Sequence, residues 1–212
     1  MLRSAATIWL HRVTVMLLTA LGSSAMARAE LVYVNGVGIE LRSLAVRGEP
    51  RAAALQMAER WRHRQPASTV TLVETRGSVV VGRQRGPIHE TALFKRGSAP
   101  GQSQVIVSAT HLGLRARALP APPFALPRGS RVLSVVESGG SGSTSAEIVI
   151  VTDRSMALTH IAVRSAAEAS GWTLQSTDPL RAARRAESLM VVVQPLDRGA
   201  SVVIQHRRNV GS

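Results

Sequence analysis

Short apolar runs separated by glycine, proline and polar residues occupy most of the chain after residue 30. Two of these runs, 31–34 and 39–46, flank Asn35-Gly36. This pair favours a tight hairpin turn because both central residues of a type I′ turn need positive φ. Further strand-like runs follow at 69–75, 78–84, 88–95 and 104–110. Their length and their content of β-branched residues predict a mainly antiparallel sheet.

One amphipathic helix is predicted between the second and third of these strands. Proline at the first helical position, Pro50, is compatible with a helix start, and Pro66 ends the periodic segment. Ala54, Met57, Ala58 and Trp61 recur at the spacing of one helix face. We therefore expect these four side chains to pack against the sheet.

The second half of the chain repeats this order of elements. Strands are expected at 131–138 and 146–153, followed by a helix with Ser155 as N-cap and Gly171 as C-terminal stop. The apolar stripe of this helix is predicted to be Leu158, Ile161, Ala162, Ala166 and Ala169. Three more strands are expected at 172–177, 188–195 and 200–207, with a polar insertion at 178–187.

A proline-rich segment separates the two halves. Residues 115–130 contain prolines 120, 122, 123 and 127, a composition typical of extended, semi-rigid linkers. We therefore predict an α+β protein made of two small modules, 30–114 and 131–212, joined by this linker. Each module would have a mainly antiparallel sheet with one helix packed on it.

The N-terminus has the layout of a secretory signal peptide. Arg3 and Arg12 precede an uncharged apolar core at 13–22, and Ala27 and Ala29 form an A-x-A cleavage site. Cleavage after Ala29 would place the protein in the periplasm or outside the cell. No later apolar run is long enough to predict a transmembrane segment.

The chain is strongly basic. Its 26 lysines and arginines, all arginine except Lys95, oppose 13 acids, for a net charge of +13. This excess favours weak contact with anionic lipid or polysaccharide. Dedicated nucleic-acid binding is not expected, because the chain has too few aromatic residues for a base-stacking platform. Arginine preference from coding bias remains the alternative explanation.

The sequence contains no recognised catalytic, cofactor or metal motif. There is no cysteine, and no histidine spacing resembles a metal face. The glycine- and serine-rich stretch 137–147 lacks the lysine and the following helix that a phosphate-binding loop requires. It is expected to be a long, mobile hairpin tip. We predict no cofactor.

The densest basic cluster, 181–185, is the best candidate for an interaction site. On a helical turn Arg181, Arg184 and Arg185 would share one face, although a solvated charged loop is the alternative. We therefore expect an exported, non-catalytic envelope protein that binds another envelope protein or itself, as an accessory of secretion, pilus or outer-membrane machinery. A basic binder of polyanions and an exported enzyme whose site cannot be recognised in the sequence remain alternatives.

Overall fold

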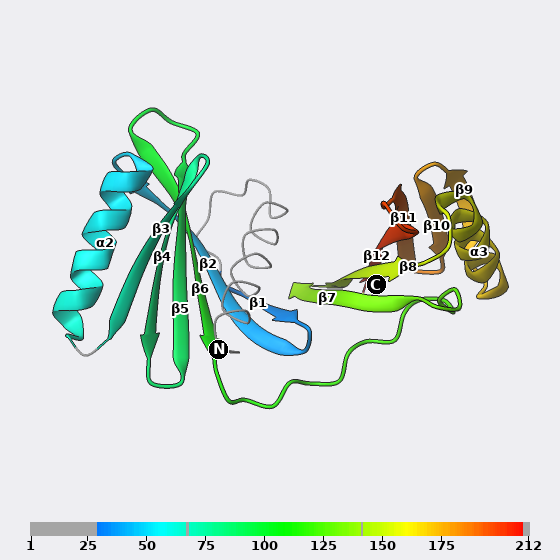
Figure 1. The fold of residues 1–212 in the computed structure, drawn as a ribbon, viewed down its shortest axis with the longest axis horizontal. Coiled ribbons are helices and arrows are strands. Elements are labelled where there is room, and N and C mark those ends of the chain that lie inside the picture. Colours follow the sequence, from blue (N-terminus) through cyan, green and yellow to red (C-terminus); the bar gives the residue numbers. More distant parts are fainter. Residues whose placement is uncertain (1–28, 67, 141, 210–212) are drawn as a thin grey trace. The chain divides into compact units, whose positions relative to one another are not determined.

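The computed structural model describes residues 29–66, 68–140 and 142–209 and shows an α+β fold (Figure 1). This confirms the α+β part of the predicted fold class. The predicted leader, 1–29, lies outside the described residues except for its last position. Among the described residues, neither helix is long and apolar enough to cross a bilayer.

Both halves contain the same sequence of elements. The first half comprises β1 (Ala29–Val34), β2 (Val37–Arg47), α2 (Pro50–Arg64), β3 (Thr69–Thr75), β4 (Ser78–Arg85), β5 (Ile88–Arg96) and β6 (Gln102–His111). The second half comprises β7 (Arg131–Gly140), β8 (Ser143–Thr152), α3 (Met156–Ala169), β9 (Thr173–Thr177), β10 (Leu180–Arg184), β11 (Glu187–Pro195) and β12 (Ala200–Asn209). Strand, strand, helix and four strands therefore occur twice.

The strand order of the sheet repeats in the same way. Hydrogen bonds join 12 strands in the order β3-β4-β5-β6-β2-β1-β7-β8-β12-β11-β10-β9, so the second half has the first half's order reversed. Contacts between Cα atoms divide the chain into two compact units. The first unit contains 40–113, and the second contains 30–39 and 114–212. The strand β1 belongs to the second unit, where it pairs antiparallel with β7.

The two hairpins that open the halves have tight turns. Asn35 and Gly36 have φ of 51° and 79°, as the predicted type I′ turn requires. In the second hairpin, pairing continues to Gly140 and Ser143. The glycine- and serine-rich stretch is thus a hairpin, as expected, but most of it is paired strand. The prediction of a long loop is wrong, because residues 137–140 and 143–147 continue the ladder.

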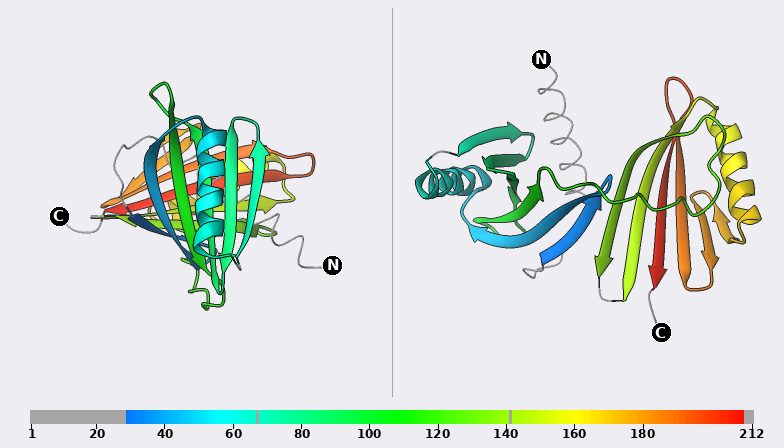
Figure 2. Two further views of the ribbon diagram at one scale, coloured as in Figure 1. Left: turned by 90° about the vertical axis from the view of Figure 1, so that its left-hand side faces the viewer. Right: turned by 90° about the horizontal axis from the view of Figure 1, so that it is seen from below.

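The first unit packs α2 across one face of its strands (Figures 1 and 2). Ala54, Ala58 and Trp61 are buried, and Met57 packs at the margin of the same core, so the predicted stripe is confirmed. Alanines allow the helix axis to approach the sheet closely. Phe94 on β5 is the largest fully buried side chain of this core.

The second unit places α3 with a different face inward from the one predicted. Thr159, Val163 and Ala167 are buried, whereas Leu158 and Ile161 are 58% and 61% exposed. The predicted stripe is wrong at Leu158, Ile161 and Ala169, which are exposed, whereas Ala166 packs at the margin of the core. Small side chains face the sheet, and bulky residues from other elements fill the core. The Thr159 hydroxyl is compatible with burial since it donates to the Arg154 carbonyl at 3.3 Å.

The proline-rich segment contributes to the core of the second unit. Phe124 is only 5% exposed and belongs to the same cluster as Val163 and Trp172. The Trp172 indole also donates to the Pro123 carbonyl at 3.1 Å. This part of the segment runs alongside α3 before β7 begins (Figure 2). It is therefore held on the second unit by an aromatic side chain and a hydrogen bond.

We predict that Phe124→Ala destabilises the second unit by about 3–5 kcal/mol, because it leaves a cavity between α3 and the sheet. Leu119→Ala, at a 48% exposed position of the same segment, should cost less than about 0.5 kcal/mol. Urea unfolding followed by circular dichroism measures both. Equal small effects would show that the segment does not pack on this core.

Candidate functional site

The predicted interaction residues lie on a strand and a turn instead of a helix. Arg181 and Arg184 are part of β10, and Arg185 begins the turn to β11 with φ of 52°. Residues three apart on a strand point to opposite faces, so Arg181 and Arg184 do not share a surface. The helical arrangement was wrong because Leu180 and Ala182 point into the core and fix a strand there.

Arg184 joins this strand to the end of α3. Its guanidinium carbon lies 4.5 Å from the centroid of the Trp172 ring, and Nη1 donates to the Ser170 carbonyl at 2.9 Å. Its Nη2 donates to Glu187 Oε2 at 2.7 Å. The cation is thus stacked on an aromatic ring and paired with a carboxylate.

The first unit contains the same arrangement at the corresponding positions. The guanidinium carbon of Arg83 lies 4.5 Å from the Trp61 ring centroid, and its Nε donates to Glu90 Oε2 at 2.6 Å. In both units the arginine and the glutamate are direct partners across neighbouring strands. We call these sets, Trp61–Arg83–Glu90 and Trp172–Arg184–Glu187, the two Trp–Arg–Glu triads.

The second triad has two additional side chains from β12. Arg208 Nε donates to Glu187 Oε1 at 2.7 Å, and His206 Nε2 lies 3.6 Å from Glu187 Oε2. The His206 ring also meets Trp172 edge to face, with the centroids 5.6 Å apart. Glu187 therefore lies between two arginines and an imidazole.

These neighbours shift the pKa values of Glu187 and His206. Hydrogen bonding from Arg184, with a further hydrogen bond from Arg208, lowers the pKa of Glu187 to about 2. Burial lowers the pKa of His206 below its usual value, an effect that the nearby Glu187 carboxylate partly opposes. At pH 7 the cluster holds an ionised carboxylate and a neutral imidazole.

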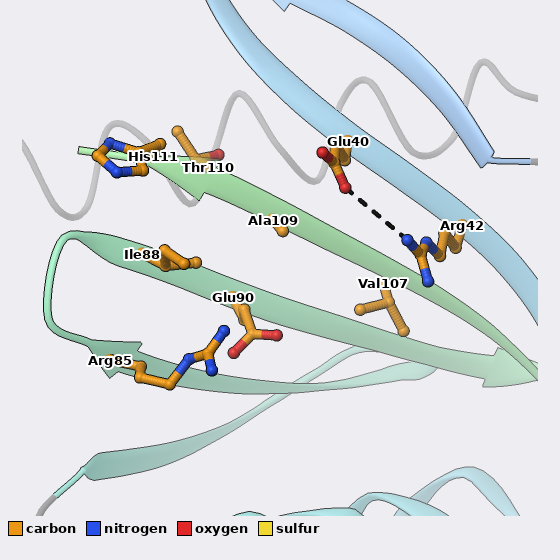
Figure 3. Close-up of a pocket in the computed structure, with 9 residues that line it drawn as sticks. All are labelled: Glu40, Arg42, Arg85, Ile88, Glu90, Val107, Ala109, Thr110 and His111. Atoms are coloured by element: carbon orange, nitrogen blue, oxygen red, sulfur yellow. Dashed lines mark ion pairs between the residues drawn. The ribbon is translucent and has the colours of Figure 1, made fainter. Parts of the chain in front are cut away.

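Each unit also has an open cavity on the helix-covered face of its sheet, beyond the apolar core. The cavity of the first unit, about 340 Å³, is lined from β2, β4, β5 and β6 (Figure 3). Glu40 and Arg42 on β2 form a long ion pair of 3.9 Å, and the Arg85 side chain reaches toward Glu90 from β4. Glu90 already belongs to the first triad, so its carboxylate holds a structural ion pair.

One cavity of the second unit, about 580 Å³, is larger than this and contains more polar groups. Tyr33, Arg117, Glu137, His206 and Arg208 line it, from β1, β7, β12 and the proline-rich segment. Arg117 lies over the Tyr33 ring, 3.5 Å from its centroid, and Nη2 contacts Glu137 Oε2 at 2.6 Å. No local sequence pattern predicts this group of residues, since they come together from distant segments.

The outer face of α3 is the other unusual surface. Leu158 and Ile161 project from it, with Met156 at its start also exposed. An ion pair of 3.2 Å between Arg164 and Glu168 lies one turn further along the helix. Large apolar residues clustered on an exposed helix face, next to charged groups, are typical of a contact surface for another protein.

Within the described ranges, no group of three or more histidines, aspartates or glutamates could hold a metal ion. Comparison with known proteins finds no family model, no curated protein and no solved structure that matches this chain.

Glu187→Gln should reduce the stability of the protein by roughly 1–2 kcal/mol at pH 7, since it leaves Arg184 and Arg208 without their carboxylate. The native pKa is lowered, so the carboxylate stabilises the fold above about pH 4.5, and this contribution disappears as pH falls toward 2. The difference between wild type and variant should therefore shrink from pH 7 to pH 3 in urea unfolding.

Glu147→Gln is the matched control, because Glu147 accepts one hydrogen bond, from Gln205, on an exposed surface. It should change stability by less than about 0.5 kcal/mol at either pH. A Glu187→Gln effect that stays constant with pH would contradict the assignment of the low pKa.

Proposed function

We propose that this is an exported, non-catalytic envelope protein that binds another exported protein through the outer face of α3. Leu158 and Ile161 carry this proposal, because each exposes more than half of its surface in the first half of a regular helix. Burying both in an interface would contribute a few kcal/mol of hydrophobic free energy. The Arg164–Glu168 pair would lie at the polar rim of that interface.

Export is supported by the leader-like pattern of the first 29 residues, with cleavage after Ala29. Two modules joined by the proline-rich segment are supported by the repeated order of elements and by the two compact units. In this arrangement the second module offers the contact face on α3. The strand β9, at the edge of the sheet, would offer backbone groups for strand addition beside it.

Protein binding explains the surface better than binding of polyanions does. Many arginines are already neutralised by glutamates, in the pairs Arg51–Glu74, Arg83–Glu90, Arg117–Glu137, Arg164–Glu168, Arg184–Glu187 and Arg208–Glu187. The remaining positive charge would support weak contact with anionic lipid or polysaccharide. It would assist a protein interaction by drawing the chain toward an acidic envelope surface.

Photo-crosslinking in cells tests this function. A photoreactive phenylalanine analogue at Ile161 should give one discrete adduct with another exported protein, identified by mass spectrometry. The same group at Arg62, exposed on α2, is the control and should give no such adduct. Leu158→Glu should abolish the adduct at 161 while changing stability by less than about 0.5 kcal/mol, because the side chain is exposed.

Two results would contradict the proposal. One is an equal pattern of adducts at 161 and 62, which would indicate random collision. The other is an adduct between two copies of this chain, which would replace the heterologous partner by self-association.

A further inference from the structure

The strand β3 forms a free edge of the sheet in the first unit (Figure 1). Among the described strands it hydrogen-bonds only to β4, and all 7 of its residues pair in one continuous register. In an antiparallel ladder, alternate residues direct their N–H and C=O groups to opposite sides of the strand. About half of the residues of β3 therefore point their backbone groups outward, where no described strand pairs with them.

Most side chains of β3 are exposed. Val70 and Leu72 are half-buried, because they pack at the margin of the core under α2. Val73 is 44% exposed, although it is apolar. The other exposed residues of the strand are Thr69, Thr71, Glu74 and Thr75. The outer edge of β3 is therefore accessible to another strand.

The strand also lacks the features that usually protect an edge. Folded proteins block an exposed edge strand with proline, lysine, a β-bulge or a very short strand. The sequence of β3, TVTLVET, contains no proline, lysine or arginine, and its register with β4 is unbroken. Its single charged residue, Glu74, accepts a hydrogen bond of 2.8 Å from Arg51 Nε. An edge rich in β-branched residues and without these features favours pairing with a further strand.

The edge strand of the second unit differs from β3. β9 has 5 residues, and Gln175 has no partner in the register between β9 and β10, so it forms a bulge. A strand added to β9 would therefore form a short ladder, whereas a strand added to β3 would pair along all 7 positions.

We propose that β3 pairs antiparallel with β3 of a second copy of this chain, so that two first units join edge to edge. The alternation of faces and the full overlap of the strands fix the register, in which Leu72 lies opposite itself at the two-fold axis. The facing pairs on either side of Leu72 are then Thr69–Thr75, Val70–Glu74 and Thr71–Val73. This ladder contains about six to eight backbone hydrogen bonds.

The side chains of β3 suit this symmetric pairing at every position. Thr–Thr, Thr–Val and Leu–Leu are favourable cross-strand pairs. Glu74 faces Val70, so no two like charges are opposed, and Glu74 keeps its ion pair with Arg51 of its own chain. A strand that complements itself in this way meets the requirement of an isologous two-fold interface. The contact uses only the first unit and does not depend on the function proposed for α3.

Sedimentation equilibrium of the purified protein from about 1 µM to about 1 mM tests the proposal, since this range covers weak and moderate affinities. In low-salt buffer, where exposed charges are least screened, we expect a reversible monomer–dimer equilibrium. Thr71→Lys combined with Val73→Lys places lysines opposite one another and should weaken dimerisation at least about tenfold. Thr71→Lys combined with Val73→Glu places opposite charges at the same positions. It should dimerise at least about tenfold more tightly than the variant with two lysines.

Gln175→Lys, on the edge of the second unit, is the control and should dimerise like wild type. Circular dichroism checks that each variant is folded, and Val73→Lys alone, which should also weaken dimerisation, is used if a double variant is not. The proposal is overturned if the wild type is monomeric throughout the concentration range, as expected if β3 instead receives a strand of a different protein. It is also overturned if the two double variants dimerise equally, or if Gln175→Lys abolishes the dimer.

Discussion

The packing of both helices depends on a buried or half-buried arginine that each unit holds between a tryptophan ring and a glutamate. Arg83 and Glu90 are only 12% and 17% exposed, so neither charge is well solvated. Such an ion pair is stable only while both partners remain, because removal of one leaves an uncompensated charge. The tryptophan adds a second constraint: Trp61 closes α2 and Trp172 follows α3, so the stacked cation ties each helix end to the fourth and fifth strands of its own half.

The repeated scaffold leaves the two halves free to differ beyond the triads. In the first unit β6 continues with Val107 and Ala109, and the adjoining cavity is small. In the second unit β12 places His206 and Arg208 at those positions, and both surround Glu187. Both units therefore contain the triad, and only the second unit adds a histidine and an arginine around its glutamate. The outer face of α3, with Leu158 and Ile161, lies on the solvent side of the helix.

Local patterns predicted most elements, and long-range packing explains the errors. Asn35-Gly36 and Pro50 each act through their own φ angles, so the hairpin and the start of α2 could be read directly. The buried face of α3 could not, because Phe124 arrives from the proline-rich segment and replaces the bulk that Leu158 would have provided. Residues 181–185 suggested a helical turn because only two core residues, Leu180 and Ala182, mark the alternation of a strand there.

The sequence did contain a signal for the triads. In each half an arginine and a glutamate lie on either side of a short turn, Arg83 with Glu90 and Arg184 with Glu187. Glu137 and His206 gave no such signal, because only the register of three strands brings them to one cavity.

A pair of double-mutant cycles tests directly whether the two triads stabilise both halves in the same way. Arg83→Met and Glu90→Gln form one cycle, and Arg184→Met and Glu187→Gln form the other, each measured by urea unfolding at pH 7. We predict a coupling free energy of about 1–3 kcal/mol in both cycles, because each single variant leaves its arginine or glutamate partner charged and unpaired, whereas the double variant removes both members of the pair. Arg208 loses Glu187 in the Glu187→Gln variant and in the double variant alike, so this loss cancels from the coupling of the second cycle. Additive effects in either cycle would contradict this prediction, since they would show that the arginine and the glutamate of that unit act independently.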